Sequence, residues 1–376
     1  MTKLIDICDI QYGYAFDSAC FTEDDSYLPL VRIRDVKRGF SETFYSGEYP
    51  EEYVIHKGDL IVGMDGEFNI ARWKSIDALL NQRVCKLKAK EGTNEEYLRF
   101  ALVKALKTIE DKTAFVTVKH LSAKELNKLE LDMPGIEEQN VRAESMAKLE
   151  KVISHRKEEL SALDNLIKAR FVELFECGDH EIVKASDVCD FITKGTTPPT
   201  GEITEEYENG KIPFLKVYNL SFTGEMLFDE NPQYILAETH NGKLARSKVY
   251  PNDVLMNIVG PPLGKFTLVT DEFEEWNINQ AIAIFRAKER ILPRFLLHAL
   301  MQPKVLEPFI GQAVGIRQQN LSLEQCRNLQ FPLPSLEEQK SFVEFAEQLD
   351  KSKVAVQKAL DETQILFDSL MQKYFG

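Results

Sequence analysis

The chain repeats one phrase of its sequence at an interval of 200 residues. HLSAKELNKLELDMPGIEEQ occupies residues 120–139, and NLSLEQCRNLQFPLPSLEEQ occupies residues 320–339. Upstream, PLVRIRDV at residues 29–36 resembles PFLKVYNL at 213–220, and LNQ at 80–82 resembles INQ at 278–280. A tandem duplication of this length predicts two similar globular domains, each with its own core, arranged in the same order along the chain.

Each copy begins with short apolar stretches that are separated by Gly, Pro, Asn and Asp. VRIRDV, DLIVGM and RVCKLKA in the first copy, and FLKVYNL, DVLMNIV and AIAIFRA in the second, have the composition of strands. EEYLRFALVKALKTI and RFLLHALMQ follow them and have the pattern of helices. The sequence therefore predicts an α+β fold with two similar mixed α/β domains in tandem.

A different pattern follows each repeated phrase, since neither residues 136–175 nor residues 336–375 contain Gly or Pro. Apolar residues recur there at steps of three, four or seven, which predicts two long helices with a coiled-coil seam. The predicted seam consists of Leu149, Ile153, Leu160, Leu163, Ile167, Leu174, Leu349, Val356, Leu360, Phe367 and Leu370, with polar interruptions at Arg156, Lys353 and Thr363. About 40 helical residues span roughly 60 Å.

We predict that the two helices pair with each other in an antiparallel coiled coil and that a pseudo-twofold axis relates the two copies. The alternative is that each helix packs only on its own domain. The predicted division is a first domain at residues 1–134, a first helix at 135–178, a second domain at 179–334 and a second helix at 335–376.

Composition limits the classes of function. The chain has 46 basic and 60 acidic residues and a net charge of −14, which argues against non-specific binding of nucleic acid and requires any DNA-binding face to be locally basic. No apolar run approaches the roughly 20 residues that cross a membrane, and the N-terminus lacks a signal-peptide core, so we expect a cytoplasmic protein. The six cysteines are scattered without a C-x-x-C pair, which favours buried free thiols over zinc or disulfides.

The motifs of common enzymes do not occur in the sequence. GPPLGKF resembles a phosphate-binding loop, but it has one residue too few between its glycines, and Phe266 stands where a magnesium-binding Ser or Thr is required. No G-x-S-x-G, no G-x-G-x-x-G and no H-x-x-x-H spacing is present. Together with the duplication, this pattern favours a binding protein without catalytic activity and without a metal site.

Nearly the whole chain resembles the specificity subunit of type I restriction–modification systems. The resemblance is carried by the repeated phrase, by GMDGEFNIARW and LLNQRV in the first copy, and by ITKGTTPP, NIVGPPLGKF and WNINQAIA in the second. It implies two target-recognition domains that each read one part of a split double-stranded DNA target, with the helices as a spacer and no cofactor in this chain. It further implies two modification subunits, which bind S-adenosylmethionine and methylate adenine, and restriction subunits that use ATP and magnesium.

The candidate DNA contacts are polar side chains in four places: the basic stretch VRIRDVKR, its counterpart in the second copy, the glycine-rich loops, and the residues at 119–120 and 317–320 where each repeated phrase begins. If VRIRDV is a strand, Arg32 and Arg34 lie on one face of it. Arg pairs with guanine, Asn with adenine, and Lys with phosphate. The predicted contacts are Arg32, Arg34, Lys37, Arg38, Asn69, Arg72, Lys119, Lys194, Thr196, Thr197, Lys216, Tyr218, Asn219, Lys265, Arg317 and Gln319.

Several alternatives remain at this point, and one of them is that one of the two recognition domains is degenerate. The basic stretch could be a solvated strand edge, and the loop GMDGEFN could be only a tight turn. The whole chain could also be an adaptor in which a coiled-coil rod separates two protein-binding domains, which the net charge of −14 would suit. Clustering of VRIRDVKR on a strand, opposite a basic counterpart in the second copy, would favour DNA recognition over the adaptor.

Overall fold

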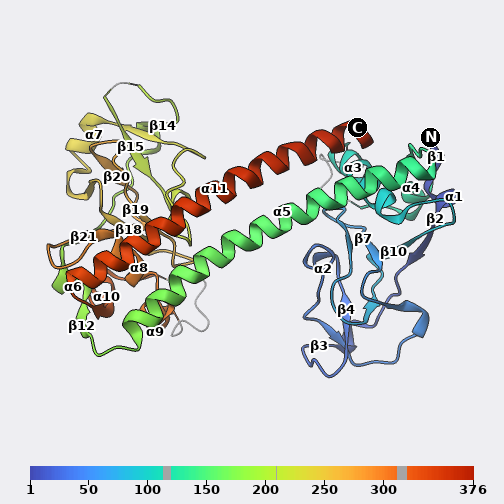
Figure 1. Ribbon diagram of the computed structural model, residues 1–376, viewed down its shortest axis with the longest axis horizontal. Helices are drawn as coiled ribbons and strands as arrows, with labels where there is room; N and C mark the ends of the chain where they lie inside the picture. Colours follow the sequence, from blue (N-terminus) through green and yellow to red (C-terminus); the bar gives the residue numbers. More distant parts are fainter. Residues whose placement is uncertain (113–119, 209, 311–319) are drawn as a thin grey trace. The chain divides into compact units, whose positions relative to one another are not determined.

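The structure is a computed structural model that describes residues 1–112, 120–208, 210–310 and 320–376. It divides into two compact units (Figure 1). Unit 1 comprises Met1–Lys157 and Lys358–Gly376, and unit 2 comprises Glu158–Gln357. Each unit therefore contains one copy of the repeat together with a part of each long helix.

The described residues of unit 1 form three sheets. The four-stranded antiparallel sheet has the order β2 (Cys8–Tyr12), β10 (Val84–Ala89), β7 (Leu60–Gly63) and β8 (Ile70–Arg72). The five-stranded sheet has the order β3 (Phe21–Thr22), β5 (Phe44–Tyr45), β4 (Leu28–Val31), β9 (Ala78–Leu80) and β6 (Val54–Ile55), and β4 runs parallel to β9. The third sheet pairs β1 (Thr2–Lys3) with β11 (Glu130–Leu131). The shorter helices are α1 (Leu4–Ile7), α2 (Ile33–Arg38), α3 (Glu95–Lys112) and α4 (Ala123–Lys128).

Unit 2 has the same topology in the same order. Its four-stranded sheet is β13 (Cys189–Lys194), β21 (Ile282–Ala287), β18 (Val254–Asn257) and β19 (Phe266–Leu268). Its five-stranded sheet is β14 (Ile203–Thr204), β16 (Tyr234–Leu236), β15 (Lys211–Leu215), β20 (Trp276–Ile278) and β17 (Lys248–Val249), and β12 (Glu181–Lys184) pairs with β22 (Gln330–Leu333). Its shorter helices are α6 (Ala185–Val188), α7 (Ala237–Asn241), α8 (Pro293–Leu300), α9 (Pro303–Ile310) and α10 (Leu323–Arg327). The prediction of two similar mixed α/β domains is thus confirmed.

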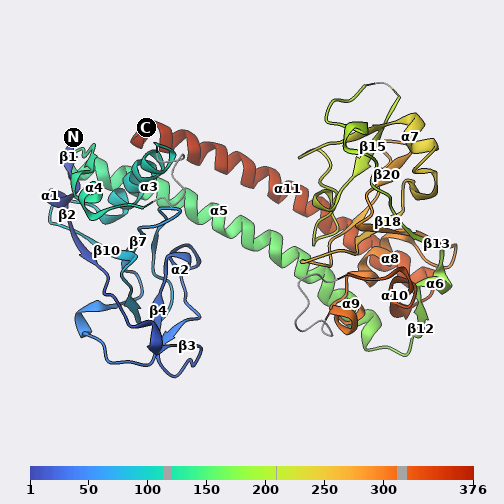
Figure 2. The ribbon, with the colours of Figure 1, turned by 180° about the vertical axis from the view of Figure 1, so that it is seen from behind.

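Unit 2 consists of two lobes, and its five-stranded sheet lies in one of them. In Figures 1 and 2, β15, β20 and α7 lie in one lobe, and α8, α9 and α10 lie in another, beside the start of the second long helix. The rings of Phe171, Phe175, Phe295 and Phe342 pack against one another there, with centroids 5.1–6.0 Å apart. This aromatic cluster joins the helices to the globule of unit 2, and all four side chains are buried.

The prediction of a strand over VRIRDV is wrong beyond its first residue, Val31. Strand β4 ends at Val31, and α2 begins at Ile33, because the Asp35 carboxylate accepts a hydrogen bond from the Arg32 backbone N–H at 2.9 Å. Arg32 and Arg34 therefore do not share a strand face. In the second copy β15 likewise ends at Leu215, and a 3₁₀ turn follows it at Val217–Asn219. Local side-chain capping overrides the alternating pattern in both places.

The two long helices form as predicted and are α5 (Ile136–Phe171) and α11 (Leu336–Phe375). A π-helical turn at Val172–Glu176 continues the first of them. Ile153, Ile167, Val356 and Leu360 are buried, and the other seven residues of the predicted seam are half-buried. The seam predicted from the heptad pattern is therefore the face that both helices withdraw from solvent.

Within each unit, one part of α5 packs beside one part of α11. In unit 2 the Lys353 ammonium contacts the Asp164 carboxylate at 2.8 Å, and Phe171 packs against Phe342, so the two helices run antiparallel there. In unit 1, Arg142 near the start of α5 donates a hydrogen bond to the carbonyl of Tyr374 near the end of α11 at 3.1 Å. The polar interruption at Lys353 is thus an ion pair between the helices.

The repeated EEQ sequence has a structural reason. The Gln339 side chain accepts a hydrogen bond from Leu292 N–H at 2.8 Å and donates to the carbonyls of Pro334 at 2.9 Å and Arg290 at 3.1 Å. Gln139 accepts from the N–H of Asn94 at 2.9 Å and donates to Pro134 at 2.8 Å in the same way. Both side chains are buried, so each glutamine joins the first turn of a long helix to its globule.

The six cysteines are free thiols. Cys8, Cys85, Cys189 and Cys326 are buried, whereas Cys20 is half-buried and Cys177 is exposed. Burial raises the pKa of Cys189 to about 12, so this thiol stays protonated and unreactive. The prediction of buried thiols is wrong for Cys177, which lies just after the first long helix.

Candidate nucleic-acid interface

Helix α2 presents most of the basic stretch of unit 1 to solvent. Arg32, Arg34, Lys37 and Arg38 are all exposed. Arg38 pairs with Glu42 at 2.9 Å, and the Arg34 guanidinium donates to the Thr43 hydroxyl at 3.3 Å. The helix ends at Gly39, whose φ of 79° favours glycine. Arg34, Lys37 and Arg38 thus share one short helix that Arg32 precedes, and acidic and hydroxyl neighbours orient Arg34 and Arg38.

The glycine-rich loop that follows β7 lies beside α2. A Cβ on Gly63 would stand 3.3 Å from the Ile33 side chain. Within the loop, Asn69 donates to the Glu67 carboxylate at 3.3 Å, and the same carboxylate is 3.7 Å from the Lys37 ammonium. The structure therefore brings together two predicted contacts, Lys37 and Asn69, around one acidic side chain.

Arg72 has a structural role in unit 1, and its predicted contact with DNA stays a prediction. Its guanidinium donates to Glu95 at 2.9 Å and to the Gly58 carbonyl at 2.8 Å, and it forms a close ion pair with Glu96. Burial lowers the pKa of Arg72, but hydrogen bonds to the two carboxylates outweigh it and leave the pKa raised. The charge of Arg72 is therefore neutralised inside the unit, where it ties β8 to the start of α3.

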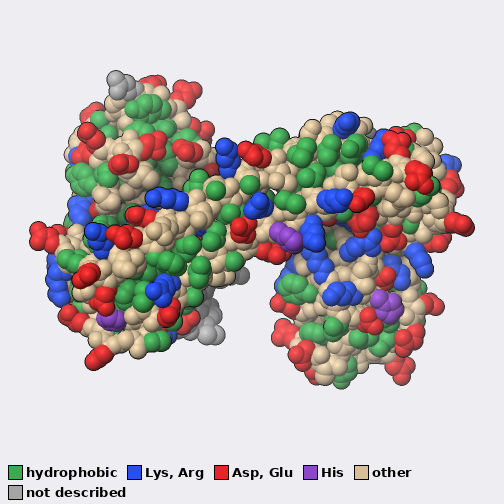
Figure 3. Space-filling model, in the orientation of Figure 1, with side chains coloured by type: hydrophobic (Ala, Val, Ile, Leu, Met, Phe, Trp, Pro, Cys, Tyr) green, Lys and Arg blue, Asp and Glu red, His purple; other side chains and the backbone are tan. Residues whose placement is uncertain are grey.

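On the face of unit 1 that Figure 3 shows, Lys and Arg side chains lie together in one region although the net charge of the chain is −14. In Figure 3, Lys and Arg side chains concentrate over the region of α2 and β7, whereas Asp and Glu side chains surround the far tip near β3. A local basic face on an acidic protein is the distribution that DNA recognition requires.

The equivalent turn of unit 2 has a different composition. Tyr218 is exposed and Lys216 is half-buried, but Asn219 is fully buried and donates to the Leu227 carbonyl at 3.1 Å. Asn219 also caps the turn by accepting from Lys216 N–H at 2.9 Å. The structure thus removes Asn219 from the predicted DNA contacts, because its amide is occupied in the interior.

Lys265 lies close to this turn in unit 2. Its ammonium is 5.7 Å from the ring centroid of Phe222, and Ser221 forms a bridge with Phe266. The loop after β18 and the turn after β15 therefore lie side by side, as their counterparts do in unit 1.

The loop at Lys194–Pro198 is shaped by a close backbone approach. A Cβ on Gly195 would stand 2.2 Å from the Ile278 carbonyl oxygen, so only glycine fits there. Lys194 and Thr197 are exposed, and the Thr196 hydroxyl accepts a hydrogen bond from the exposed Arg246 at 3.0 Å. The sequence analysis missed Arg246, which is 50 residues away in an unremarkable stretch, and only the fold brings it to this loop.

Three predicted contacts, Lys119, Arg317 and Gln319, lie outside the described residues. The chain directly after them is held in place in both units. The backbone N–H of Leu121 donates to Met64 at 2.7 Å, and that of Leu321 donates to Ile258 at 2.9 Å.

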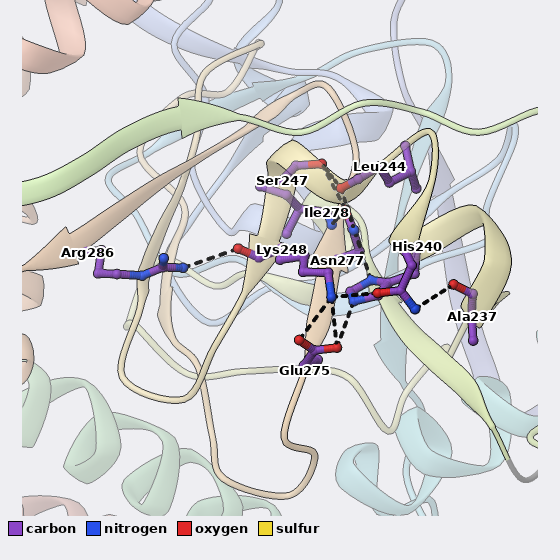
Figure 4. Close-up of polar contacts among 10 residues, drawn as sticks. Ala237, His240, Leu244, Ser247, Lys248, Glu275, Asn277, Ile278 and Arg286 are labelled. Carbon is purple, nitrogen blue, oxygen red and sulfur yellow. Dashed lines mark hydrogen bonds and ion pairs between the residues drawn. The ribbon is translucent and has the colours of Figure 1, made fainter.

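A buried polar network supports β20 in unit 2 (Figure 4). The His240 ring contacts the Asn277 amide nitrogen and the Glu275 carboxylate, both at 3.1 Å, and the Ser247 hydroxyl donates to the Asn277 oxygen at 3.0 Å. Because the amide nitrogen is a donor, the ring nitrogen that faces it must accept, so His240 is neutral. Burial lowers the pKa of His240 accordingly.

This network has no counterpart in unit 1, where the buried Leu79 occupies the position of Asn277 in the sheet. His240, Ser247 and Asn277 are all fully buried, so the arrangement of histidine and serine is structural rather than catalytic. It fixes the end of β20, from which Asn279 and Gln280 continue to the surface.

In the described ranges, no three His, Cys, Asp or Glu side chains gather in an arrangement that could hold a metal ion. Likewise, none of the described helices combines the length and the apolar character needed to cross a membrane.

Comparisons with known proteins agree on one family. The family model described as type I restriction modification DNA specificity domain matches residues 1–164 and 178–363. The chain is 32% identical over 400 residues to the EcoBI specificity subunit of Escherichia coli, with 98% of this chain and 84% of that protein covered. It is 23% identical over 366 residues to the MjaVIII specificity subunit of Methanocaldococcus jannaschii, with 90% and 84% covered.

Solved structures share the fold. The S subunit of a type I restriction–modification system from M. genitalium matches with a TM-score of 0.56 at 15% identity, covering 100% of this chain and 95% of that chain. A chain from a study of complex assembly and conformational transition of the type I system matches with a TM-score of 0.53 at 19% identity, covering 100% and 96%.

Proposed function

The chain belongs to the type I restriction–modification DNA specificity family, and on that premise we propose that it reads a split DNA target, one half with each unit. It is a specificity subunit and not an enzyme, since catalysis in these systems lies in partner subunits.

The observation that carries this proposal is that the two units share one topology but carry different polar side chains, exposed or half-buried, at the same place. Unit 1 presents Arg34 and Lys37 on α2, and unit 2 presents Lys216 and Tyr218 on the equivalent turn. Sequence-specific readers differ in the side chains that reach base edges and keep the scaffold that places them. Two such sets on one scaffold suit two different half-sequences.

The long helices suit a spacer between the two readers. We propose that residues 1–134 and 179–334 are the recognition domains, and that the helical segments 135–178 and 335–376 set the gap between the half-sequences. The partners in this proposal are two modification subunits that bind S-adenosylmethionine and methylate adenine, and restriction subunits that use ATP and magnesium.

The adaptor alternative is not retained. Its support was the net charge of −14, but the family model that matches the chain is that of a DNA specificity domain, and Lys and Arg side chains lie over the region of α2 and β7 on the face that Figure 3 shows. A protein-binding rod would require neither.

The test is selection from a pool of random-sequence DNA duplexes by the purified chain in complex with its modification subunit. The expected result is enrichment of one target with two defined half-sequences and an unspecified gap of fixed length. Enrichment of a single continuous sequence, or no enrichment by a complex that is assembled and folded, would contradict the proposal.

A further inference from the structure

Three segments of unit 1 meet in a hydrogen-bonded frame at the end of the four-stranded sheet. The backbone N–H of Met64 donates to the carbonyl of Arg83 at 2.9 Å, and the N–H of Leu121 donates to the carbonyl of Met64 at 2.7 Å. Asp65 and His120 form a bridge in the same place. The loop after β7, the turn before β10 and the start of the repeated phrase are thereby fixed side by side.

Unit 2 has the same frame, bond for bond. The N–H of Ile258 donates to the carbonyl of Ala281 at 2.8 Å, and the N–H of Leu321 donates to Ile258 at 2.9 Å. Val259 and Asn320 form the equivalent bridge. Positions 65, 83 and 120 of unit 1 therefore correspond to positions 259, 281 and 320 of unit 2.

A fourth segment closes each frame. Gly13 N–H donates to the carbonyl of Val84 at 3.0 Å, and Val84 N–H donates to the carbonyl of Asn81 at 2.9 Å. In unit 2 the same two bonds, at 3.1 and 3.2 Å, involve Gly195, Ile282 and Asn279. The backbone at these positions is thus set by many repeated contacts and does not depend on the side chains attached to it.

The side chains on the two frames differ in chemistry. In unit 1 the Asp65 carboxylate is 3.4 Å from the Arg83 guanidinium and in close contact with the His120 ring. The side chain of Asp65 is only 19% exposed, whereas those of Arg83 and His120 are 52% and 48% exposed. The Asp65 carboxylate therefore lies beside Nε of Arg83 and Nδ1 of His120, and about half of the Arg83 side chain is exposed.

The frame of unit 2 has neither a charge nor an imidazole. Asn320 is exposed, and Val259 and Ala281 are half-buried, so a single amide stands beside two small apolar side chains. Arg recognises guanine through its O6 and N7 atoms, Asn recognises adenine, and small apolar side chains contact the thymine methyl group. The two sets thus suit a G·C pair in one half-sequence and an A·T pair in the other.

We propose that these three frame positions determine specificity, with Arg83 contacting guanine in the half-sequence of unit 1 and Asn320 contacting adenine in that of unit 2. Asp65 is a positioning residue that acts through Arg83 and His120. The inference rests on the proposed function and deepens it, because it says which residues make the two readers different. The duplication keeps the frame and exchanges the side chains on it.

The test transplants one set onto the other frame. The triple variant Asp65→Val, Arg83→Ala, His120→Asn gives unit 1 the side chains that the same backbone already holds in unit 2. Random-duplex selection with the complete complex should then show a changed base preference in the half-sequence of unit 1. The preference for guanine should fall by about tenfold or more at one position or two, which is the discrimination of one bidentate contact. The other half-sequence and the gap should stay the same.

Two further variants provide a second test and a control. Arg83→Gln alone should lose the guanine preference, whereas Lys57→Ala, which changes an exposed cation of unit 1 outside the frame, should leave both half-sequences unchanged. The assignment would be overturned if the triple variant and Arg83→Gln both selected the same half-sequence as the wild-type complex. It would also be overturned if these variants enriched the same bases, only more weakly. Failure of the wild-type complex to select any split target would instead refute the proposed function itself.

Discussion

Replacing Gln339 with Leu tests the explanation given for the repeated EEQ sequence. The change keeps the size of a buried side chain and removes three hydrogen bonds, to Leu292, Pro334 and Arg290. The N–H and the two carbonyls would be left without partners at the junction of α11 and its globule. Each such group costs roughly 1–1.5 kcal/mol, so unit 2 should lose about 4 kcal/mol of its free energy of unfolding.

The duplication supplies a matched variant. Gln139→Leu removes only two hydrogen bonds, to Asn94 and Pro134, and should lower the free energy of unfolding of unit 1 by about 2.5 kcal/mol. Gln348→Leu, at an exposed position of α11, should have almost no effect and serves as the control.

The two tryptophans of the chain allow each unit to be followed separately. Trp73 is buried in unit 1 and Trp276 in unit 2, so a Trp→Phe change at either position leaves a reporter for the other unit. Urea unfolding of these single-tryptophan proteins, followed by fluorescence, measures each transition. A loss below about 1 kcal/mol for Gln339→Leu, or an equal shift of the Trp73 transition, would refute the reasoning.

Three further outcomes are expected. Burial lowers the pKa of His298 from 6.5 to about 4, so as the pH falls the unfolded chain binds this proton before the folded chain does. The contribution of neutral His298 to the free energy of unfolding of unit 2 should be complete above pH 6.5 and should fall by about 3 kcal/mol as the pH drops to 4. Urea unfolding at several pH values measures this slope, and His298→Phe should abolish most of it. Lys353→Met should destabilise unit 2 by about 3 kcal/mol, because it leaves the half-buried carboxylates of Asp164 and Asp350 without their shared cation. Adding Asp164→Leu to this variant should recover part of the lost free energy of unfolding. If it recovers none, the ion pair does not explain the loss. Inserting residues into the helical segment 143–175 should change the gap of the selected target and neither half-sequence, whereas altered half-sequences would refute the role of the helices as a spacer.

The elements that repeat were the most predictable from the sequence. The heptad pattern identified a seam whose residues are all withdrawn from solvent, because burial of one helix face leaves a regular trace in the sequence. The repeated glutamines were visible as a motif, but their role was not. That role depends on the N–H groups of Asn94 and Leu292, which lie 45 and 47 residues away and show no pattern of their own.

The candidate DNA contacts were predicted less well, because residue type does not reveal burial or partners. Asn219 was chosen for its amide, yet that amide caps a turn in the interior. Arg72 was chosen for its charge, yet Glu95 and Glu96 neutralise it. Conversely, Arg83 was not among the predicted contacts, because its proposed role depends on the neighbouring Asp65 and on a backbone frame formed by segments that are distant in the sequence.

The buried network around His240 was also invisible in the sequence. Its members come from α7, the turn before β17 and strand β20, and the equivalent position in the first copy is a leucine. Such an exchange of an apolar residue for a satisfied polar network shows how far two copies of one fold diverge in their interiors while the topology stays the same.

The most direct test of the central claim is a map of adenine methylation in a host that expresses this chain with its modification subunit, compared with a host that expresses the modification subunit alone. The account predicts that a new methylated motif appears with the chain, made of two defined half-sequences and a gap of fixed length. The same map with and without the chain, while the modification subunit is active, would contradict it.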